Sequence, residues 1–310
     1  CVQAKAAGLT DKEIAGFANH MQNKHGFDAE QVTEILRLTN ISDAVLERMS
    51  KPAEGLPWHR YRNIFLKDDR IRAGVGFWRT HQSTLEKAEQ RYGVPPEIIT
   101  AIIGVETFYG ERAGKDKVLD SLVTLGFRYP RRAKFFRSEL ESFLLLVRDE
   151  GLDPFRTKGS YAGAMGIPQF ISSSYRAYAV DFDGDNVRDL LSSTSDAIGS
   201  VANYLGQHGW RRGESIAFPA KVTGTGYKGL LAKGIEPKTQ ISTMQSNGIT
   251  LYSQVDANAK AALMDFELTD GVEYWVGLKN FYVITRYNHS SLYALAVFQL
   301  SQAIKEQYEG

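Results

Sequence analysis

One apolar run places the strongest constraint on the fold of this 310-residue chain. The segment "VPPEIITAIIGVETFYG" (94–110) has the 3.6-residue period of a helix and apolar residues on nearly every side. A helix that is hydrophobic all round must be buried, so the rest of the chain has to build a core around it. Like the other apolar stretches of the chain, it is far too short to cross a bilayer, and no transmembrane segment is predicted.

Glu106 continues the apolar stripe of this predicted helix. Ile99, Ile103 and Glu106 follow the spacing i, i+4, i+7 and therefore share one face. A carboxyl group on such a face is poorly solvated, which raises its pKa, and an acid that is still protonated near neutral pH can protonate a leaving oxygen. The alternative is a residue at a frayed helix end that points into water.

The composition argues against several functions. Lys and Arg (37) nearly balance Asp and Glu (36), so the chain lacks the charge excess that attracts nucleic acid or anionic lipid. The six histidines form no HExxH pair and Cys1 is the single cysteine, which argues against zinc and excludes an intrachain disulfide. Because the chain begins at Cys1, a lipidated mature N-terminus and a trimmed sequence both stay open.

Helical signals dominate outside one segment, so the sequence predicts a mainly helical α+β protein. Capping boxes begin helices at Thr10 and Asp28, and one long periodic segment closes at Gly93. Between 211 and 287, β-branched and aromatic residues surround an Asp270-Gly271 turn, which predicts a small antiparallel β insertion. Further helices are expected over 119–127, 131–150, 173–180, 196–207 and 291–305.

A glycine-rich stretch, "GSYAGAMGIPQF" (159–170), is a candidate binding loop. Gly163 and Gly166 flank Met165, so the backbone can approach a ligand closely. Gln169 can donate and accept hydrogen bonds, which suits sugar hydroxyl and acetamido groups. A plain glycine-rich connection is the alternative.

An acidic stretch, "DFDGDNVRD" (181–189), matches part of an EF-hand calcium loop. Asn186 replaces the usual glycine but tolerates the left-handed conformation, and Ser192 replaces the usual bidentate glutamate. Asp196 is a candidate substitute in a longer loop. Three carboxylates in five residues repel one another without a cation, which favours calcium over a solvated turn. The ligand positions 1, 3, 5 and 7 are occupied by Asp181, Asp183, Asp185 and Val187.

The segment "RYNHSSLYALAV" (286–297) places polar groups around a helix start. Asn288 or Ser290 is the expected N-cap. Tyr287 and Tyr293 are candidates for contacts with a ligand, and core tyrosines with one polar tip are the alternative.

In their order along the chain, these motifs resemble the lytic transglycosylase B family, bacterial enzymes that cut the glycan strands of peptidoglycan. The resemblance covers most of the chain from about 58 to 300. The matching stretches are "YRNIF" (61–65), "GVPPEIITAIIGVETFYG" (93–110), "TLGFRYPRRAKFF" (124–136), "GSYAGAMGIPQF" (159–170), "DFDGDNVRDL" (181–190), "DAIGSVANYLGQHGW" (196–210) and "FYVITRYNHSSLYALAV" (281–297).

The resemblance implies a goose-lysozyme-like catalytic core with added parts. A helical domain would span 1–92, the core with its EF-hand-like loop 93–210, and a small β domain 211–285. The last helix, 286–310, would pack back on the helical parts. The family's acid/base glutamate falls on Glu106. Its substrate contacts fall on Tyr61, Ser160, Met165, Gln169, Tyr204, Tyr287, Asn288 and Tyr293, and its structural calcium site on Asp181, Asp183, Asp185, Val187 and Asp196.

The implied reaction cleaves the β-1,4 bond between N-acetylmuramic acid and N-acetylglucosamine and closes a 1,6-anhydro ring on the muramic acid. One glutamate acts as acid and base, the substrate's acetamido group assists, and no organic cofactor is needed. Peptidoglycan strands are the expected partner, with proteins of cell-wall synthesis or division as further candidates. The expected location is the periplasm, with an outer-membrane anchor if Cys1 is lipidated.

Two other functions compete with this reading. A hydrolytic muramidase needs a second carboxylate to activate water. Glu111, Asp116 and Asp120 are the nearest in sequence, but none has a spacing that selects it. The second alternative is a non-catalytic protein that binds glycan, against which the presence of Glu106 argues.

Overall fold

The computed structural model describes residues 8–50, 55–231 and 234–310. The chain divides into two compact units, each built from two separate stretches. Among the described residues, unit 1 comprises 8–50 and 110–197, and unit 2 comprises 55–109 and 198–310 without 232–233. Cys1 lies outside the described residues, and its lipidation stays a prediction. The four domains predicted from the sequence stay a prediction as well.

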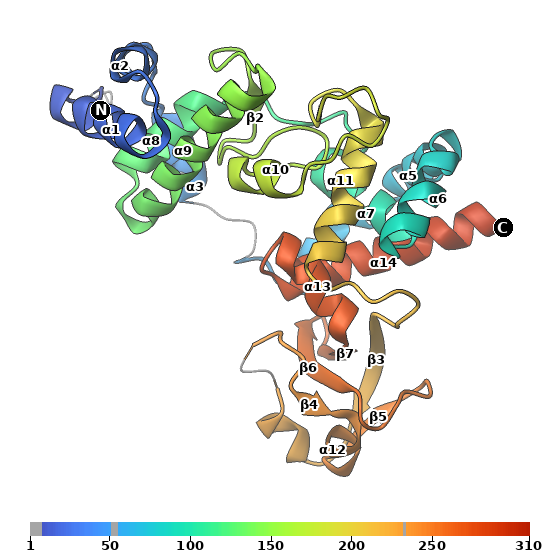
Figure 1. Cartoon of the computed structure of the whole chain (residues 1–310). Helices are drawn as coiled ribbons and strands as arrows, with labels where there is room; N and C mark the ends of the chain where they lie inside the picture. The colour runs from blue at the N-terminus through green and yellow to red at the C-terminus, as the bar shows by residue number, and fades with distance from the viewer. Residues whose placement is uncertain (1–7, 51–54, 232–233) are drawn as a thin grey trace. The chain divides into compact units, whose positions relative to one another are not determined.

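Unit 1 is mainly helical. Helices α8 and α9 lie side by side (Figure 1). Both contribute fully buried apolar side chains, such as Leu122 and Phe143. The capping box predicted at Thr10 is confirmed, because its side chain and that of Glu13 bond reciprocally to the backbone. The elements of unit 1 are α1 (Asp11–His25), α2 (Ala29–Arg37), α3 (Asp43–Met49), β1 (Asp116–Lys117), α8 (Val118–Arg128), η2 (Pro130–Arg132), α9 (Ala133–Glu150), β2 (Lys158–Gly159) and α10 (Ser172–Tyr178).

Unit 2 surrounds the apolar helix predicted from the sequence. This helix, α7 (Pro96–Thr107), buries ten of its twelve residues and packs against α5, α6 and α14. The prediction of a central buried helix is therefore confirmed. The helices of unit 2 are α4 (Trp58–Phe65), α5 (Asp68–Thr80), α6 (Gln82–Tyr92), α7, α12 (Ile241–Ser246), α13 (Lys279–Tyr287) and α14 (Ser291–Glu309), with η3 (Gly226–Gly229); α11 (Thr194–Gln207) begins in unit 1 and continues into unit 2.

Unit 2 also contains the small antiparallel sheet, in the strand order β4-β6-β7-β3-β5. The predicted hairpin is confirmed: β6 and β7 pair from Ala262 opposite Gly277 to Glu267 opposite Val272, and Gly271 in the turn has φ 103°. Helix α12 lies beside β4 and β5 (Figure 1) and closes a core that includes Met244. The strands are β3 (Ala217–Val222), β4 (Thr239–Gln240), β5 (Ile249–Leu251), β6 (Lys260–Glu267) and β7 (Val272–Gly277).

Two local predictions are wrong. The periodic segment 68–93 is two helices, because His81 has φ −111° and ψ 21° and interrupts the helical backbone between α5 and α6. The residues "KNFYVITRY" were expected to continue the β insertion, but they form α13. Phe281, Val283 and Ile284 are buried there, and this burial outweighs the strand preference of β-branched and aromatic residues.

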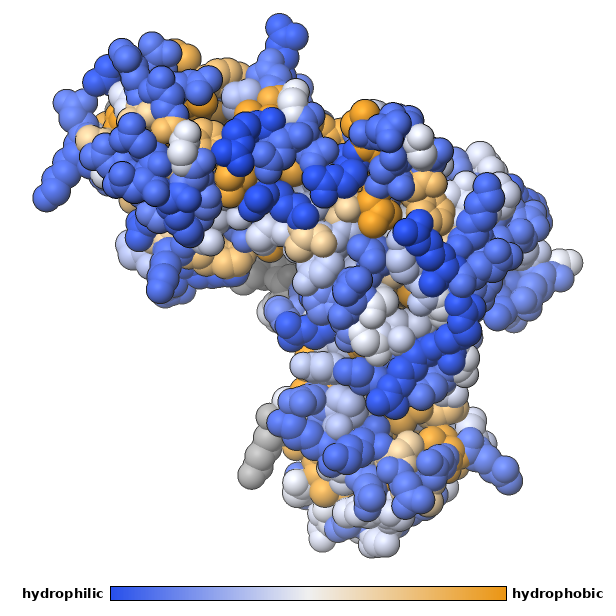
Figure 2. All heavy atoms as spheres, in the orientation of Figure 1, coloured by the Kyte–Doolittle hydropathy of each residue, from blue (hydrophilic) through white to orange (hydrophobic). Residues whose placement is uncertain are grey.

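The outer surface agrees with the balanced composition. On the face drawn in Figure 2, hydrophilic residues cover most of the protein and apolar residues form small separate groups. Among the helices of the described residues, none combines the length and the apolar character that a membrane span requires.

Candidate active site

Glu106 lies in the last turn of α7 and is joined to α14 by a hydrogen bond. Tyr293 Oη donates to Glu106 Oε1 at 2.6 Å, and Tyr293 is only 2% exposed. The Glu106 side chain is half-buried, and its Oε2 forms no hydrogen bond with a described residue. The alternative of a frayed helix end that points into water is therefore wrong. Tyr293 thus holds one carboxyl oxygen of Glu106, and the other has no hydrogen-bond partner among the described residues.

Three more of the predicted tyrosines lie around this pair. The rings of Tyr287 and Tyr293 stack with centroids 6.4 Å apart and planes 9° apart. Tyr204 meets Tyr287 edge-on at 4.9 Å and donates through Oη to a backbone carbonyl at 2.6 Å. Tyr61, which is 4% exposed, acts electrostatically on Tyr293. Unit 2 therefore gathers Glu106 and four aromatic rings in one cluster.

Asn288 lies where this cluster meets the start of α14. It ends α13 with extended backbone dihedrals and is half-buried. Of the two predicted caps, Ser290 is the one that acts, because its Oγ accepts the Tyr293 amide hydrogen at 3.3 Å. Asn288 is thus not used as the N-cap, and its predicted role in substrate contact stays a prediction.

The cluster changes the proton affinity of the Glu106 carboxyl group. Burial raises the pKa of Glu106 to about 7, although the hydrogen bond from Tyr293 acts in the opposite direction by stabilising the charged form. Burial, with a contribution from the nearby Glu106, raises the pKa of the Tyr287 and Tyr293 hydroxyls well above its usual range. Tyr293 therefore stays a hydrogen-bond donor, and the raised pKa of Glu106 agrees with its predicted place on an apolar helix face.

Another glutamate on α7 shows that this arrangement is specific to Glu106. Glu97, which is 8% exposed, pairs with Lys305 of α14 at 3.1 Å. Among the described residues no cation acts on the pKa of Glu106, which is set by burial and by Tyr293. A desolvated carboxylate without a cation is costly to ionise. Glu97 thus has a cationic partner, whereas the carboxyl group of Glu106 has a neutral one.

Three other predicted contacts, Ser160, Met165 and Gln169, lie in one loop of unit 1. Ser160 Oγ accepts hydrogen bonds from the amides of Ala162 and Ala164 at 3.3 and 3.0 Å. Gln169 Nε2 donates to two backbone carbonyls at 3.0 and 2.9 Å, and Met165 is fully buried. These side chains therefore hold the loop in shape. The Gln169 Oε1 atom forms no hydrogen bond with a described residue.

The glycines of this loop pack closely against other residues of unit 1. Gly163 and Gly166 have φ 84° and 72°, in the left-handed region. A Cβ on Gly163 would lie 2.5 Å from Leu122 Cδ2, and one on Gly166 would lie 2.2 Å from the Leu190 carbonyl oxygen. Packing within the chain therefore accounts for both glycines, and a close approach of a ligand to this backbone stays a prediction. Their missing side chains make room for unit 1 itself.

The acidic loop brings three of its five predicted ligands together. Carboxylate oxygens of Asp181, Asp183 and Asp196 lie within 4.8 Å of one another. Asp196 is 1% exposed and accepts the amides of residues 182 and 189, both at 2.8 Å. Asp185 lies outside this group and accepts the amide of Val187 at 2.8 Å. Asn186 has φ 69°, which confirms the predicted left-handed conformation.

This cluster fits a hard divalent cation. Burial, together with the charge of Asp183, raises the pKa of Asp196. Three carboxylates this close repel one another, and Ca²⁺ prefers such oxygen ligands in a flexible geometry. Asp181, Asp183 and Asp196 are therefore the residues that could hold the ion.

Comparisons with known proteins show the family of this chain. The transglycosylase SLT domain family matches residues 10–302. The chain belongs to this family. It is 47% identical over 298 residues to the membrane-bound lytic murein transglycosylase B of Escherichia coli strain K12. The alignment covers 93% of this chain and 81% of that protein. The resemblance inferred from the motifs is confirmed.

Solved structures of family members share the fold. Catenated SltB1 from Pseudomonas aeruginosa is 46% identical with a TM-score of 0.92, over 96% of this chain and 99% of that one. Escherichia coli Slt35 in complex with calcium is 45% identical with a TM-score of 0.89, over 99% of this chain and 97% of that one. The expected mainly helical fold with a small antiparallel sheet is confirmed.

In this family member, sequence reasoning missed the residues that fix the end of α7. Phe108 and Tyr109 both have positive φ, 51° and 61°. Tyr109 Oη donates to the carbonyl of Arg70 in α5 at 2.8 Å, and Arg70 Nη1 donates to the carbonyl of Gly104. A Cβ on Gly104 would lie 2.6 Å from Tyr109 Oη. Gly74 and Gly104 lie inside helices, where a glycine usually indicates close packing against another part of the chain. These two residues were the sequence signal that could have predicted the contact.

The three carboxylates considered for hydrolysis all belong to unit 1. Asp116 is bound by Arg48 at 3.0 Å, and Asp120 accepts the amide of Asn40 at 3.0 Å. Glu111 is exposed. Asp116 and Asp120 thus have structural partners, and neither stands free as a base for water.

Proposed function

We propose that this chain is a lytic murein transglycosylase that cleaves the β-1,4 bond between N-acetylmuramic acid and N-acetylglucosamine, with Glu106 as its single acid/base. Membership of the transglycosylase SLT domain family supports the reaction class. The observation that carries the role of Glu106 is its desolvated carboxyl group, with a pKa of about 7 and a hydrogen bond from Tyr293. An acid with such a pKa is partly protonated and partly ionised at neutral pH, as a group that gives and then takes a proton requires.

In the proposed mechanism, protonated Glu106 gives its proton to the glycosidic oxygen as the bond to the muramic acid breaks. The acetamido oxygen of the same sugar stabilises the anomeric carbon. Ionised Glu106 then takes the proton of the C6 hydroxyl, whose oxygen closes the 1,6-anhydro ring. The glycosidic bond is replaced by the anhydro bond, the proton passes to the leaving sugar, and no water is consumed.

The residues around Glu106 suit this sequence of steps. Tyr293 occupies Oε1, so we assign the proton transfers to Oε2. The buried rings of Tyr61, Tyr204 and Tyr293 lower the local polarity and limit the access of water. We propose that these tyrosines, Tyr287 and Asn288 contact the glycan. Ser160, Met165 and Gln169 are proposed as further contacts of the same substrate.

We propose calcium as a structural ion of unit 1. Asp181, Asp183 and Asp196 would hold it, with Asp185 and the Val187 carbonyl as further proposed ligands. The solved complex of Slt35 with calcium supports this assignment. The ion would neutralise the carboxylates of the loop. The name of the membrane-bound relative supports a place in the cell envelope, with the periplasm and an anchor at Cys1 as the finer proposals.

Mass spectrometry of the muropeptides released from purified peptidoglycan tests the proposal. The parent protein should release products with 1,6-anhydromuramic ends. Glu106→Gln keeps the shape of the side chain but cannot exchange a proton, so we expect a loss of roughly a thousandfold or more in rate. Glu97→Gln, on the same helix, is the matched control and should release the same anhydro products.

Two results would overturn the proposal. Products with free reducing ends identify a hydrolytic muramidase. A protein that releases no muropeptides, with Glu106→Gln binding glycan as the parent does, is a non-catalytic glycan-binding protein.

A further inference from the structure

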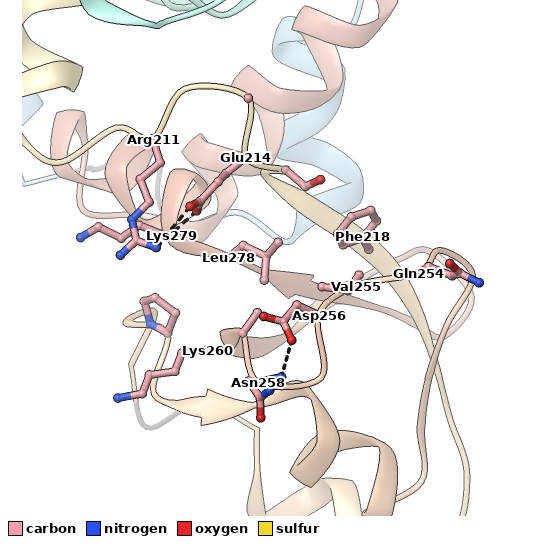
Figure 3. Close-up of a pocket in the computed structure, with 14 residues that line it drawn as sticks. Arg211, Glu214, Phe218, Gln254, Val255, Asp256, Asn258, Lys260, Leu278 and Lys279 are labelled. Atoms are coloured by element: carbon pink, nitrogen blue, oxygen red, sulfur yellow. Dashed lines mark hydrogen bonds and ion pairs between the residues drawn. The ribbon is translucent and has the colours of Figure 1, made fainter.

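Unit 2 contains a cleft that the proposed reaction does not use. It has a volume of about 810 Å³, within the range of small-ligand sites. Arg211, Glu214 and Lys279 lie on one side, and Asp256 and Lys260 on the other (Figure 3). None of the residues around Glu106 lines it.

One wall of the cleft is held by a fully buried amide. Asn280, in the first turn of α13, accepts the Arg211 amide hydrogen through Oδ1 at 2.8 Å. Its Nδ2 donates to the carbonyls of Arg211 and Glu214 at 2.8 and 2.9 Å. Three hydrogen bonds from one buried side chain therefore fix the loop that carries these two charged residues. Such a wall is preorganised for a ligand.

The opposite wall is fixed by backbone bonds to α12. Ala259 and Ala257 accept the amides of Ile241 and Ser242 at 3.0 and 2.9 Å. Asp256 Oδ1 accepts the amide of Asn258 at 3.0 Å, a bond drawn in Figure 3. Both walls of the cleft are thus held by hydrogen bonds of the protein itself.

The charged residues that line the cleft have an excess of one positive charge, because Arg211, Lys260 and Lys279 are accompanied by Glu214 and Asp256. Arg211 is paired with Glu214 at 3.4 Å. Lys260 and Lys279 form no ion pair with a described residue, and Lys279 Nζ lies 5.3 Å from the centre of the Tyr282 ring. The apolar lining is Phe218, Pro237, Val255, Ala259 and Leu278. Two cations beside an apolar lining match a carboxylate carried on a short peptide.

Helix α13 connects the cleft with Glu106. Lys279 is its first residue and Tyr287, which stacks on Tyr293, is its last. Eight residue steps at 1.5 Å give a separation of about 12 Å along the helix. An extended peptide of four residues spans about 13 Å. An extended peptide of four residues is therefore about as long as the separation between Tyr287 and Lys279 along α13.

We propose that this cleft is a subsite for the peptide stem of peptidoglycan, with Lys260 and Lys279 binding the stem's terminal carboxylate. The inference rests on the proposed function, since it assigns a second part of the same substrate. A peptide joined to muramic acid through its amino end keeps a free carboxylate at its other end. SltB3 of Pseudomonas aeruginosa, a relative 30% identical to this chain, has been solved in complex with NAG-anhNAM-pentapeptide.

Binding of two ligands by the full chain tests the subsite. Isothermal titration with NAG-anhNAM-pentapeptide and with NAG-anhNAM separates contacts to the peptide from contacts to the sugars. The variant Lys260→Gln/Lys279→Gln removes both charges and keeps most of the aliphatic stems. We expect it to bind the pentapeptide ligand roughly three- to tenfold more weakly than the parent, and NAG-anhNAM equally well. The control is Lys221→Gln/Lys228→Gln, whose exposed lysines belong to the same unit and lie outside the cleft.

The outcomes separate this inference from the proposed function. Equal affinity of parent and variant for the pentapeptide ligand overturns the subsite, and so does an equal loss for both ligands. Release of anhydro products depends on Glu106 and is scored separately. If no anhydro products form but the lysines still determine binding of the pentapeptide ligand, the subsite stands and the proposed reaction fails.

Discussion

The Glu106 site and the acidic loop at 181–196 use the same chemical group in opposite ways. Glu106 is a single carboxyl group beside buried tyrosines, and its one hydrogen-bond donor is the neutral Tyr293. In the loop, Asp181, Asp183 and Asp196 lie within 4.8 Å of one another. Backbone amides bond to Asp181 and Asp196 at 2.7–2.8 Å.

The difference shows that neighbours, rather than residue type, decide what a carboxyl group does. One desolvated carboxyl group without a cation takes up a proton, because the neutral form needs no counter-charge. Several carboxylates that face one another need a cation instead. The first arrangement suits proton transfer and the second suits metal binding. Removing one carboxylate should therefore have opposite consequences at the two sites.

The largest expected effect is on how stability depends on pH. The pKa of Glu106 is about 7 in the folded chain against 4.5 as the unperturbed value, so the folded state holds its proton more tightly. Stability from this proton is fully present below pH 4.5, is lost as the pH rises to about 7, and stays lost above it. The loss is on the order of 3 kcal/mol. When the pH rises from 4 to 8, the free energy of unfolding of Glu106→Gln should therefore increase by about 3 kcal/mol relative to that of the parent. Denaturant unfolding at the two pH values measures this difference.

Glu97→Gln is the matched control on the same helix. It breaks the ion pair with Lys305, so at pH 8 it should lower the free energy of unfolding where Glu106→Gln raises it. If the free energy of unfolding of Glu106→Gln did not increase relative to the parent between pH 4 and pH 8, the carboxyl group would not be desolvated. The contrast between the two sites would then disappear.

Calcium should act on the acidic loop and leave Glu106 unaffected. Calcium at a hundred times its dissociation constant should stabilise the parent by about 2.7 kcal/mol, which corresponds to a rise of roughly 4 °C in melting temperature for a chain of this length. Asp183→Asn removes one of the three clustered carboxylates and should abolish most of the rise, whereas Glu106→Gln should keep all of it. Melting curves with EDTA and with added calcium measure this. A melting temperature that does not respond to calcium would argue against the site.

The central helix and its acid could be predicted from the sequence because both depend on local spacing. The period of 94–107 sets which residues are buried, and Glu106 follows from its place on that face. Asp196 was a candidate ligand because Ser192 replaces the usual bidentate glutamate of the loop, and the structure brings Asp196 to Asp181 and Asp183. Helix α13 was missed because its β-branched residues are selected by burial in unit 2, which the local sequence does not show.

Other features depend on contacts between distant residues. Tyr109 bonds to the carbonyl of Arg70, 39 residues earlier in the chain. No spacing rule predicts that contact. Gly163 and Gly166 have the composition of a ligand-binding loop, but Leu122 and Leu190 occupy the space beside them. A glycine that approaches a ligand and one that approaches its own chain look alike in sequence.

Glycine substitutions test whether the end of α7 must be held for Glu106 to act. A Cβ on Gly104 would lie 2.6 Å from Tyr109 Oη, so Gly104→Ala should cost about 1–3 kcal/mol of stability. Because the displaced turn carries Glu106, kcat should fall more than KM changes. Gly76→Ala in α5, where no atom lies within 4 Å, is the control and should stabilise the helix by up to about 1 kcal/mol. Equal kcat values for the two variants would show that this packing does not position Glu106.

The smallest effect is expected from Tyr293→Phe, which removes only the hydroxyl that bonds to Glu106. This hydrogen bond stabilises the ionised carboxylate and lowers its pKa, so without it the pKa of Glu106 should rise. The activity of Tyr293→Phe should therefore begin to fall at a higher pH than that of the parent. At pH 5 its kcat/KM should be at most about tenfold lower than that of the parent. Tyr308→Phe, on the same helix and stacked on Trp78, should leave the pH profile unchanged. A profile that moves to lower pH in Tyr293→Phe would mean that the hydroxyl favours the protonated acid, and Glu106 would then owe its neutrality to Tyr293 rather than to burial.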